Sequence, residues 1–310
     1  MKRSGIIILF FVFFLSQGKA QVNPEIYNYW ENLYYVNPSN IRFDYTAYLT
    51  LNTRVQWVDF PGAPVSAHLS AAFPISKIRS QVATKLFVDR IGYTNTIELL
   101  LSYAYSLKIN HDNSLNFGVS GALHSRTYDF SKISAEDMLD PTIYSEKVNG
   151  ILEGNMSLGL EYNYKDVLQV GVSTRNFMSY FPALRANRRN PLQSATNMLY
   201  AKYLTHYFGE TNWYMDFGAA FRQYDARYVG DFMTSVYYDF NSLYSLQFQL
   251  FGGTAGDVGF TVGVNLLSDL KLLCSYNYNY AVVNTNSYGT FEIMLTYGFK
   301  RCPTCINVWK

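Results

Sequence analysis

Two cysteines near the end of the chain have the spacing of a redox motif. They are Cys302 and Cys305, with a proline and a threonine between them. A reactive thiol of this kind needs a helix N-terminus that favours its thiolate, whereas these cysteines lie in a polar tail after the last expected strand. Zinc would need two further ligands, and no neighbouring pair of cysteines or histidines supplies them. We therefore expect a local disulfide between Cys302 and Cys305 in an oxidising compartment.

The histidines are scattered and belong to no metal-binding or nucleophilic signature. They are His68, His111, His124 and His206. A hydrolase would need a serine and a histidine brought together by neighbouring strands, and no sequence signature marks such a pair. We expect no catalytic residue, no metal site and no cofactor, and we predict that the protein is not an enzyme. The alternative is an enzyme, and an enzymatic activity that a single Ser or His substitution abolishes would support it.

The composition is unusual for a soluble domain of this length. Aromatic residues make up 17% of the chain, with 28 Tyr and 22 Phe, while charged residues make up only 15%, against about 25% in typical globular domains. The net charge of +2 lacks the strongly basic character of nucleic-acid-binding proteins. The composition favours a Tyr-rich membrane barrel and argues against a nucleic-acid partner.

The first 20 residues have the features of a secretory signal peptide. Lys2 and Arg3 precede an apolar run over residues 6–15, and small residues lead to Ala20. We predict cleavage before Gln21, and since that residue is not a cysteine, no lipoprotein anchor. After the signal, no apolar stretch approaches the roughly 18–20 residues of a transmembrane helix. We therefore predict that the chain is exported and is not a helical protein of the inner membrane.

Most of the mature chain alternates between apolar and small or polar residues. In residues 115–125, Leu115, Phe117 and Val119 alternate with Asn116 and Gly118. This period suits strands that face lipid on one side and a lumen on the other. The expected strands are residues 44–57, 65–75, 81–90, 96–107, 114–125, 151–164, 167–176, 196–208, 212–221, 230–239, 244–252, 257–266, 270–282 and 288–299.

The lengths of the connections alternate as well. Counted from the first strand, the odd-numbered connections include both long insertions, residues 126–150 and 177–195, and the even-numbered ones are tight. Bacterial barrels have short periplasmic turns and longer outer loops. We therefore predict an all-β fold, a transmembrane antiparallel up-and-down barrel of about fourteen strands with both termini periplasmic. A periplasmic all-β protein is the alternative.

This pattern divides the chain into four parts. They are a signal peptide (residues 1–20), a periplasmic N-terminal segment (21–43), an outer-membrane barrel (44–299) and a periplasmic C-terminal tail (300–310).

Several short motifs resemble the PorP/SprF family. The Tyr-rich segment Tyr29–Pro38 ends in Asn-Pro, Gln56–Pro64 reads QWVDFPGAP, and Asp89–Gly92 reads DRIG. Two further matches are Tyr103–Tyr105 and Tyr128–Lys132, so that the resemblance covers residues 27–133. The candidates for partner contact that it marks are Tyr34, Asn37, Pro38, Gln56, Trp57, Phe60, Gly62, Ala63, Pro64, Asp89 and Gly92.

The resemblance implies a role in type IX secretion. Barrels of this family, found in Bacteroidota, lie in the outer membrane and contact a periplasmic ring of a lipoprotein and associated subunits. They assist the export or surface attachment of cargo such as adhesins, in some cases for gliding motility. A porin or substrate-specific transporter is the alternative, since a barrel of this size can enclose an open lumen.

For two features the sequence leaves two interpretations open. Trp57 and Phe60 flank a turn made by Pro61, Gly62 and Pro64; they are either anchors at the lipid interface or contacts for a partner. The basic cluster of Arg185, Arg188 and Arg189 is either a solvated loop or a contact for anionic lipopolysaccharide or acidic cargo.

Overall fold

The computed structural model describes residues 26–129, 147–148, 152–181, 194–205, 211–224, 227–241, 244–266, 269–280 and 287–300. The predicted signal peptide, Cys302 and Cys305, His206 and the basic cluster at Arg185 lie outside these residues.

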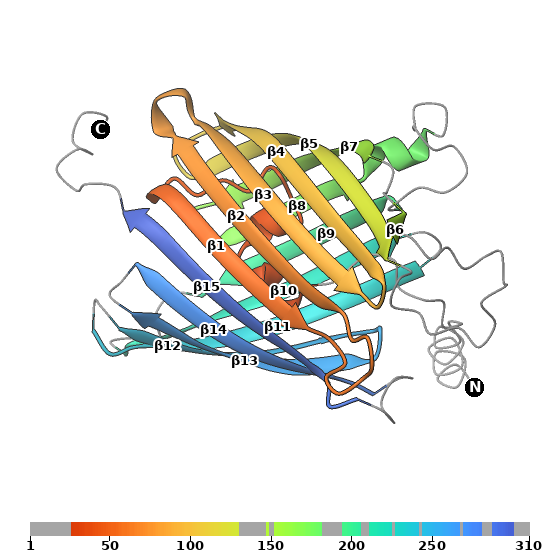
Figure 1. Cartoon of the computed structure of the whole chain (residues 1–310). Coiled ribbons are helices and arrows are strands. Elements are labelled where there is room, and N and C mark those ends of the chain that lie inside the picture. Colours follow the sequence, from red (N-terminus) through yellow and green to blue (C-terminus); the bar gives the residue numbers. More distant parts are fainter. Residues whose placement is uncertain are drawn as a thin grey trace, which may run out of the picture.

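Fourteen long antiparallel strands close into a barrel (Figure 1). Each strand pairs with the strands before and after it in the sequence, and the first strand pairs with the last. They are β1 (Tyr45–Val55), β2 (Val65–Ile75), β3 (Ser80–Ile91), β4 (Thr94–Lys108), β5 (Asn113–Asp129), β7 (Leu152–Tyr164), β8 (Leu168–Arg175), β9 (Thr196–Leu204), β10 (Trp213–Tyr224), β11 (Arg227–Asp239), β12 (Ser245–Gly253), β13 (Asp257–Leu266), β14 (Leu270–Asn279) and β15 (Thr290–Lys300).

The predicted barrel is therefore confirmed, and every expected strand overlaps an observed one. β2 and β13 coincide with the expected ranges 65–75 and 257–266. The sequence does not predict the two-residue strand β6 (Lys147–Val148), which pairs with the end of β5. Two residues are too few to show a period.

Alternation explains why these sequences form a barrel. In β4 the outward positions include Ile97, Leu99 and Leu101, and the inward positions include Glu98 and Ser102. Because successive side chains point to opposite faces, the outer surface becomes a continuous apolar band and the inner surface becomes largely polar. Because β1 pairs with β15, the fourteen long strands form a closed ring, which suits the interior of a bilayer, where an open sheet edge is not tolerated.

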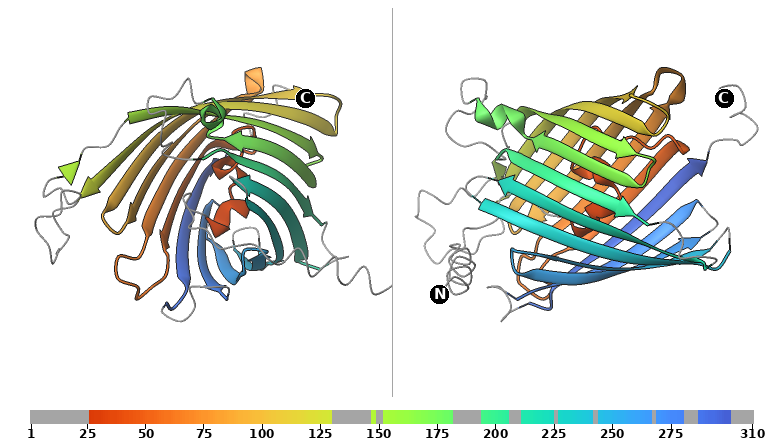
Figure 2. Two further views of the ribbon diagram at one scale, coloured as in Figure 1. Left: turned by 90° about the vertical axis from the view of Figure 1, so that its right-hand side faces the viewer. Right: turned by 180° about the vertical axis from the view of Figure 1, so that it is seen from behind.

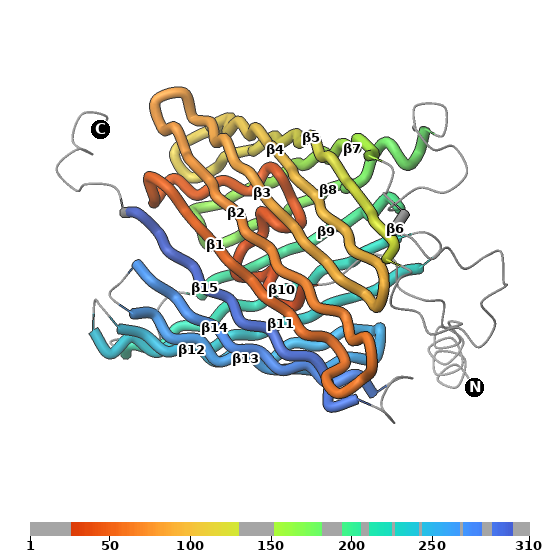
Figure 3. Tube along the Cα trace, viewed as in Figure 1, coloured from red at the N-terminus to blue at the C-terminus, as the bar shows by residue number. Residues whose placement is uncertain are grey.

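The connections form two different rims. We call the rim with the connections β2–β3, β4–β5, β7–β8, β9–β10, β11–β12 and β13–β14 the short-turn rim, and the opposite one the long-loop rim (Figure 3). Both long insertions join strands at the long-loop rim, as the sequence predicts. β1 begins and β15 ends at the short-turn rim. Within the described residues, no helix is long and apolar enough to cross a membrane.

Residues 26–43, which we call the luminal segment, lie inside the barrel (Figure 2). The segment contains two single 3₁₀ turns, η1 (Tyr27–Trp30) and η2 (Leu33–Tyr35). The sequence predicts a periplasmic segment over residues 21–43, so the part that the structure describes differs from this expectation. The segment is too short to bury its aromatic side chains against one another. It buries them instead against the wall of the lumen, which is wide in a barrel of this size.

The outward positions of β4 allow a test of how deep each residue lies in the membrane. Leu101, at the middle of β4, is 60% exposed on the outer face, and Leu107, near the short-turn rim, is 45% exposed. We expect Leu101→Lys to destabilise the folded barrel by about 2–4 kcal/mol and Leu107→Lys by about 0–1 kcal/mol, because a charge costs most at the bilayer midplane. Urea titrations in lipid vesicles measure both. Equal losses would contradict the proposed membrane position.

Candidate functional site in the barrel lumen

The luminal segment makes its own turns and no strand pairing. Its internal hydrogen bonds include those from Val36 N and Asn37 N to Leu33 O (3.1 and 2.9 Å) and from Asn40 N to Asn37 O (3.2 Å). Residues 26–43 take part in none of the strand ladders. The segment is therefore held in the lumen by side chains.

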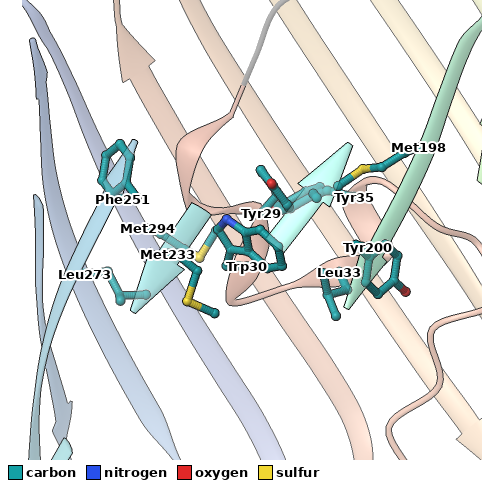
Figure 4. Packing of buried hydrophobic residues seen from close by; sticks show 11 residues of the cluster. Tyr29, Trp30, Leu33, Tyr35, Met198, Tyr200, Met233, Phe251, Leu273 and Met294 are labelled. Carbon is teal, nitrogen blue, oxygen red and sulfur yellow. The ribbon is translucent and has the colours of Figure 1, made fainter. Parts of the chain in front are cut away.

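Its aromatic residues pack on an apolar strip of the wall (Figure 4). Tyr29, Trp30, Leu33 and Tyr35 are all buried there. We call the wall part the methionine-rich strip; it consists of Met198, Ala220, Met233, Phe251, Leu273 and Met294. Burying each large apolar side chain contributes roughly 1.5–3 kcal/mol, so this packing is a main source of the segment's binding energy.

A buried carboxylate binds the start of the segment. Glu292 of β15 accepts hydrogen bonds from Tyr27 N (3.0 Å) and Asn28 N (3.2 Å), and Arg54 of β1 lies 3.3 Å from the same carboxylate. A buried charge is costly unless it is paired and hydrogen-bonded. Here the cation pairs it, and two backbone donors from the segment complete its hydrogen bonding.

The Asn-Pro turn is bound by a second polar cluster. Asn37 Nδ2 donates to the hydroxyl of Tyr200 (3.1 Å), which donates to Glu161, and Asn40 Nδ2 donates to Glu161 Oε2 (3.0 Å). Within the turn, Ser39 N donates to Asn37 Oδ1 (3.0 Å). Asn37 thus connects the turn to the wall, and an apolar side chain would leave the Tyr200 hydroxyl without this donor.

Glycines on the wall make room for the segment. Gly118 of β5 and Gly159 of β7 are paired in register. A Cβ on Gly118 would overlap the backbone of Ser39, and one on Gly159 would overlap Asn37 Oδ1. Since this approach leaves no space for a side chain, the two glycines set where the turn can lie.

An ion pair binds the middle of the segment. Glu31 Oε2 lies 2.7 Å from Lys271 Nζ, and Lys202 Nζ donates to the carbonyl of Trp30 (3.0 Å) while pairing with Asp216 (3.1 Å). Burial raises the pKa of the Glu31 carboxyl, but the surrounding cations, Lys271 foremost, lower it, so that its pKa lies below the ordinary value. Glu31 is therefore ionised at neutral pH.

A small cavity of about 60 Å³ remains between the segment and the wall toward the long-loop rim. Its lining includes Tyr35, His68, Lys85, Glu98 and Arg175. A water needs about 10–15 Å³ of such space, so the cavity has room for a few waters. Among the described residues, no cluster of His, Cys, Asp or Glu could hold a metal ion.

The structure places the candidate residues from the sequence in two groups. Tyr34, Asn37 and Pro38 belong to the luminal segment, where the hydroxyls of Tyr34 and Ser102 lie 2.6 Å apart. The second group lies at the long-loop rim, in the β1–β2 connection and the neighbouring β3–β4 connection. It consists of Gln56, Trp57, Phe60, Gly62, Ala63, Pro64 and Gly92. Asp89 is buried on the inward face of β3.

The structure joins the second group directly. Gly92 N donates to Gly62 O (3.1 Å), and Gln56 N donates to Pro64 O (2.9 Å). Trp57 has a φ of +54°, an uncommon conformation for a bulky residue, and its ring meets that of Phe60 at 6.3 Å. The two motifs that are separate in the sequence thus form one continuous surface at this rim.

The wall residues that bind the segment are absent from the sequence-based candidates. Glu161, Glu292, Gly118 and Gly159 come from three different strands. Alternation does predict that Gly118 faces inward, but no sequence pattern tells which inward residues contact the segment. That information lies in the register of the closed barrel.

Comparisons with known proteins agree with this architecture. A family model described as "Type IX secretion system membrane protein PorP/SprF" matches residues 18–297. No curated protein matches the chain. Among solved structures, the CymD monoaromatic hydrocarbon channel has a TM-score of 0.53 at 12% identity and covers 86% of this chain and 92% of its own. The toluene transporter TodX of P. putida has a TM-score of 0.51 at 10% identity, with 86% and 94% covered. At these identities the likeness is one of fold alone.

The glycines provide a test of the luminal contacts. Gly118→Val should displace the Asn-Pro turn, so that the amides of Val36, Asn37 and Asn40 exchange with solvent at least tenfold faster, a change of about 1.4 kcal/mol or more. Gly121→Val is the matched control, because a Cβ at Gly121 meets nothing within 4 Å. Hydrogen exchange followed by mass spectrometry measures both. Unchanged exchange in Gly118→Val would contradict the contact.

The ion pair provides a second test. Lys271→Met should destabilise the protein by about 2 kcal/mol or more, because it leaves the buried Glu31 charge unpaired. Glu31→Gln combined with Lys271→Met should recover most of this loss, since neither charge then remains. Thermal unfolding in detergent compares the two variants. A double variant no more stable than Lys271→Met would show that the pair itself is not the cause.

Proposed function

This chain belongs to the PorP/SprF family of type IX secretion system membrane proteins, and we propose that it is a non-enzymatic structural component of that secretion machine. The family match spans residues 18–297, well beyond the range 27–133 in which individual motifs are recognisable. The protein is an outer-membrane β-barrel. The observation that carries the proposal beyond the family is that the chain's own luminal segment occupies the lumen.

The two rims supply two surfaces for different partners. By the rule that periplasmic turns are short, the short-turn rim faces the periplasm and the long-loop rim faces outward. In this orientation the subunits of the periplasmic ring contact the short-turn rim, and a secreted, adhesin-like cargo contacts the long-loop rim. Because residues 26–43 lie in the lumen, contact with the ring involves the turns of the rim.

Two turns of the short-turn rim carry the features of such a contact. Ile78 and Ile109 are 55% and 58% exposed, and the turns are linked by a hydrogen bond from Ser106 N to Arg79 O (2.8 Å). Each turn thus presents a large apolar side chain, and the basic residue Lys77 lies beside Ile78. We assign these two turns to contact with periplasmic subunits.

Loss of the gene tests the proposed function. Without the protein, we expect type IX cargo to be retained inside the cell or released without surface attachment. Cargo in culture fluid and on the cell surface is measured by quantitative immunoblotting. Full export and correct attachment in the deletion strain would refute the proposal.

Paired variants separate the two rims. Ile78→Ser with Ile109→Ser should lower the amount of periplasmic ring proteins that co-purify in mild detergent, and Trp57→Ala with Phe60→Ala should leave it unchanged. If Trp57→Ala with Phe60→Ala lowers the amount of surface-attached cargo, the long-loop rim has the partner-contact role. If this variant lowers neither the co-purifying ring proteins nor the surface-attached cargo, Trp57 and Phe60 are anchors at the lipid interface.

A channel is the second candidate, because the structures with this fold include one titled a hydrocarbon channel and one titled a toluene transporter. The contacts of residues 26–43 argue against an open passage in the state described. The purified protein should therefore be silent in planar bilayers. Large, reproducible conductance or saturable uptake would favour transport.

A further inference from the structure

The wall binds the main chain of the luminal segment as a receptor binds a peptide. Gln81 provides both halves of such a contact: its Nε2 donates to Asn40 O (2.9 Å), and its Oε1 accepts from Arg42 N (3.3 Å). Ser173 Oγ donates to Val36 O (2.7 Å). With Glu292 and Lys202, these side chains satisfy main-chain groups along most of the segment. Side chains that bind a main chain in this way would bind another peptide of the same shape.

The wall also distinguishes particular side chains. The ring of Trp30 lies against Gly218, where a Cβ would overlap it, and it packs on the methionine-rich strip. Asn37 fits against Gly159 and donates to Tyr200. Methionine side chains adapt to different aromatic partners. The site therefore selects an aromatic pair, Tyr29 and Trp30, followed by an Asn-Pro turn.

The barrel itself does not depend on this occupant for its hydrogen-bonded frame. The ladders around the barrel are complete without residues 26–43, because β1 pairs with both β2 and β15. Much of the remaining inward surface consists of buried polar side chains such as Ser235, Gln247 and Gln249. Such a surface tolerates water, as lumens of membrane barrels do. Departure of the segment would thus break side-chain contacts and leave the strands paired.

We propose that the lumen is a peptide-binding site for peptides with this aromatic pair and Asn-Pro turn, that residues 26–43 occupy it in cis, and that this occupant exchanges with the same peptide supplied in trans. The bound segment closes the lumen, and its release opens it. The site is defined by the methionine-rich strip, Gln81, Glu161, Ser173, Lys202 and Glu292.

The attachment of the segment to β1 decides how the test must be designed. The segment continues directly into β1 at Tyr45, so its effective concentration at the site is high, on the order of millimolar for a short tether. A free peptide cannot displace the wild-type segment at micromolar concentration. The cis segment must therefore be weakened while the wall stays intact.

The experiment uses the full chain with Trp30→Ala and Asn37→Ala. A fluorescent synthetic peptide of residues 26–43 should bind this variant saturably, and should bind the wild-type chain at least tenfold more weakly. The same peptide with both alanine substitutions is the control ligand and should also bind at least tenfold more weakly. Adding Gly159→Leu to the variant should abolish binding, because it fills the space for Asn37.

Conductance provides the functional readout. In planar bilayers the variant should conduct, and the wild-type peptide should block that conductance at the concentrations at which it binds. A folded variant that neither conducts nor binds the peptide would overturn the proposal, as would equal binding of the peptide and its alanine control.

A measurement on the wild-type chain covers the case in which the variant does not fold. If the segment dissociates as a unit, the amides of Tyr35, Val36, Asn37 and Asn40 should exchange together and at least tenfold faster than those of the central strands. Protection equal to that of the strands would refute exchange. These assays use purified protein and do not measure secretion. Peptide exchange can therefore be refuted while the role in secretion stands, and the role in secretion can be refuted while peptide exchange stands.

Discussion

The structure depends first on the pairing of every main-chain polar group across the membrane. Inside a bilayer no water is present to satisfy a free N–H or C=O group. The chain meets this constraint with one continuous meander in which β1 and β15 complete the ring. Two-residue alternation then follows, because a strand in such a ring has one face in lipid and the other in the lumen.

The filled lumen is a consequence of that ring. A barrel of this many strands has an interior too wide for its own wall side chains to fill. The luminal segment occupies this space, and the wall is adapted to it at particular points. Gly118 and Gly159 allow the Asn-Pro turn to approach, Glu292 binds the first main-chain amides, and the methionine-rich strip covers the aromatic rings.

This arrangement gives the family motifs different physical roles. The Tyr-rich Asn-Pro motif lies inside the barrel, where its residues contact the wall. The motif around Trp57 lies at the long-loop rim, where Gly62 and Gly92 join two neighbouring connections. The Asn-Pro motif therefore fills the lumen, and the motif around Trp57 shapes a surface that partners can reach. A shared function in secretion does not require that both contact a partner.

From the sequence alone follow the class of fold, the number and approximate position of the long strands, and the rim to which each long insertion belongs. These properties are local, because alternation and turn residues act over a few neighbouring positions. The position of residues 26–43 and the wall residues that bind them follow from the closed barrel and from no local pattern. Trp30 meets Gly218, and Tyr27 meets Glu292, only because the closed barrel brings distant strands around the same short segment. Contacts of that kind depend on register and curvature, which no single stretch of sequence records.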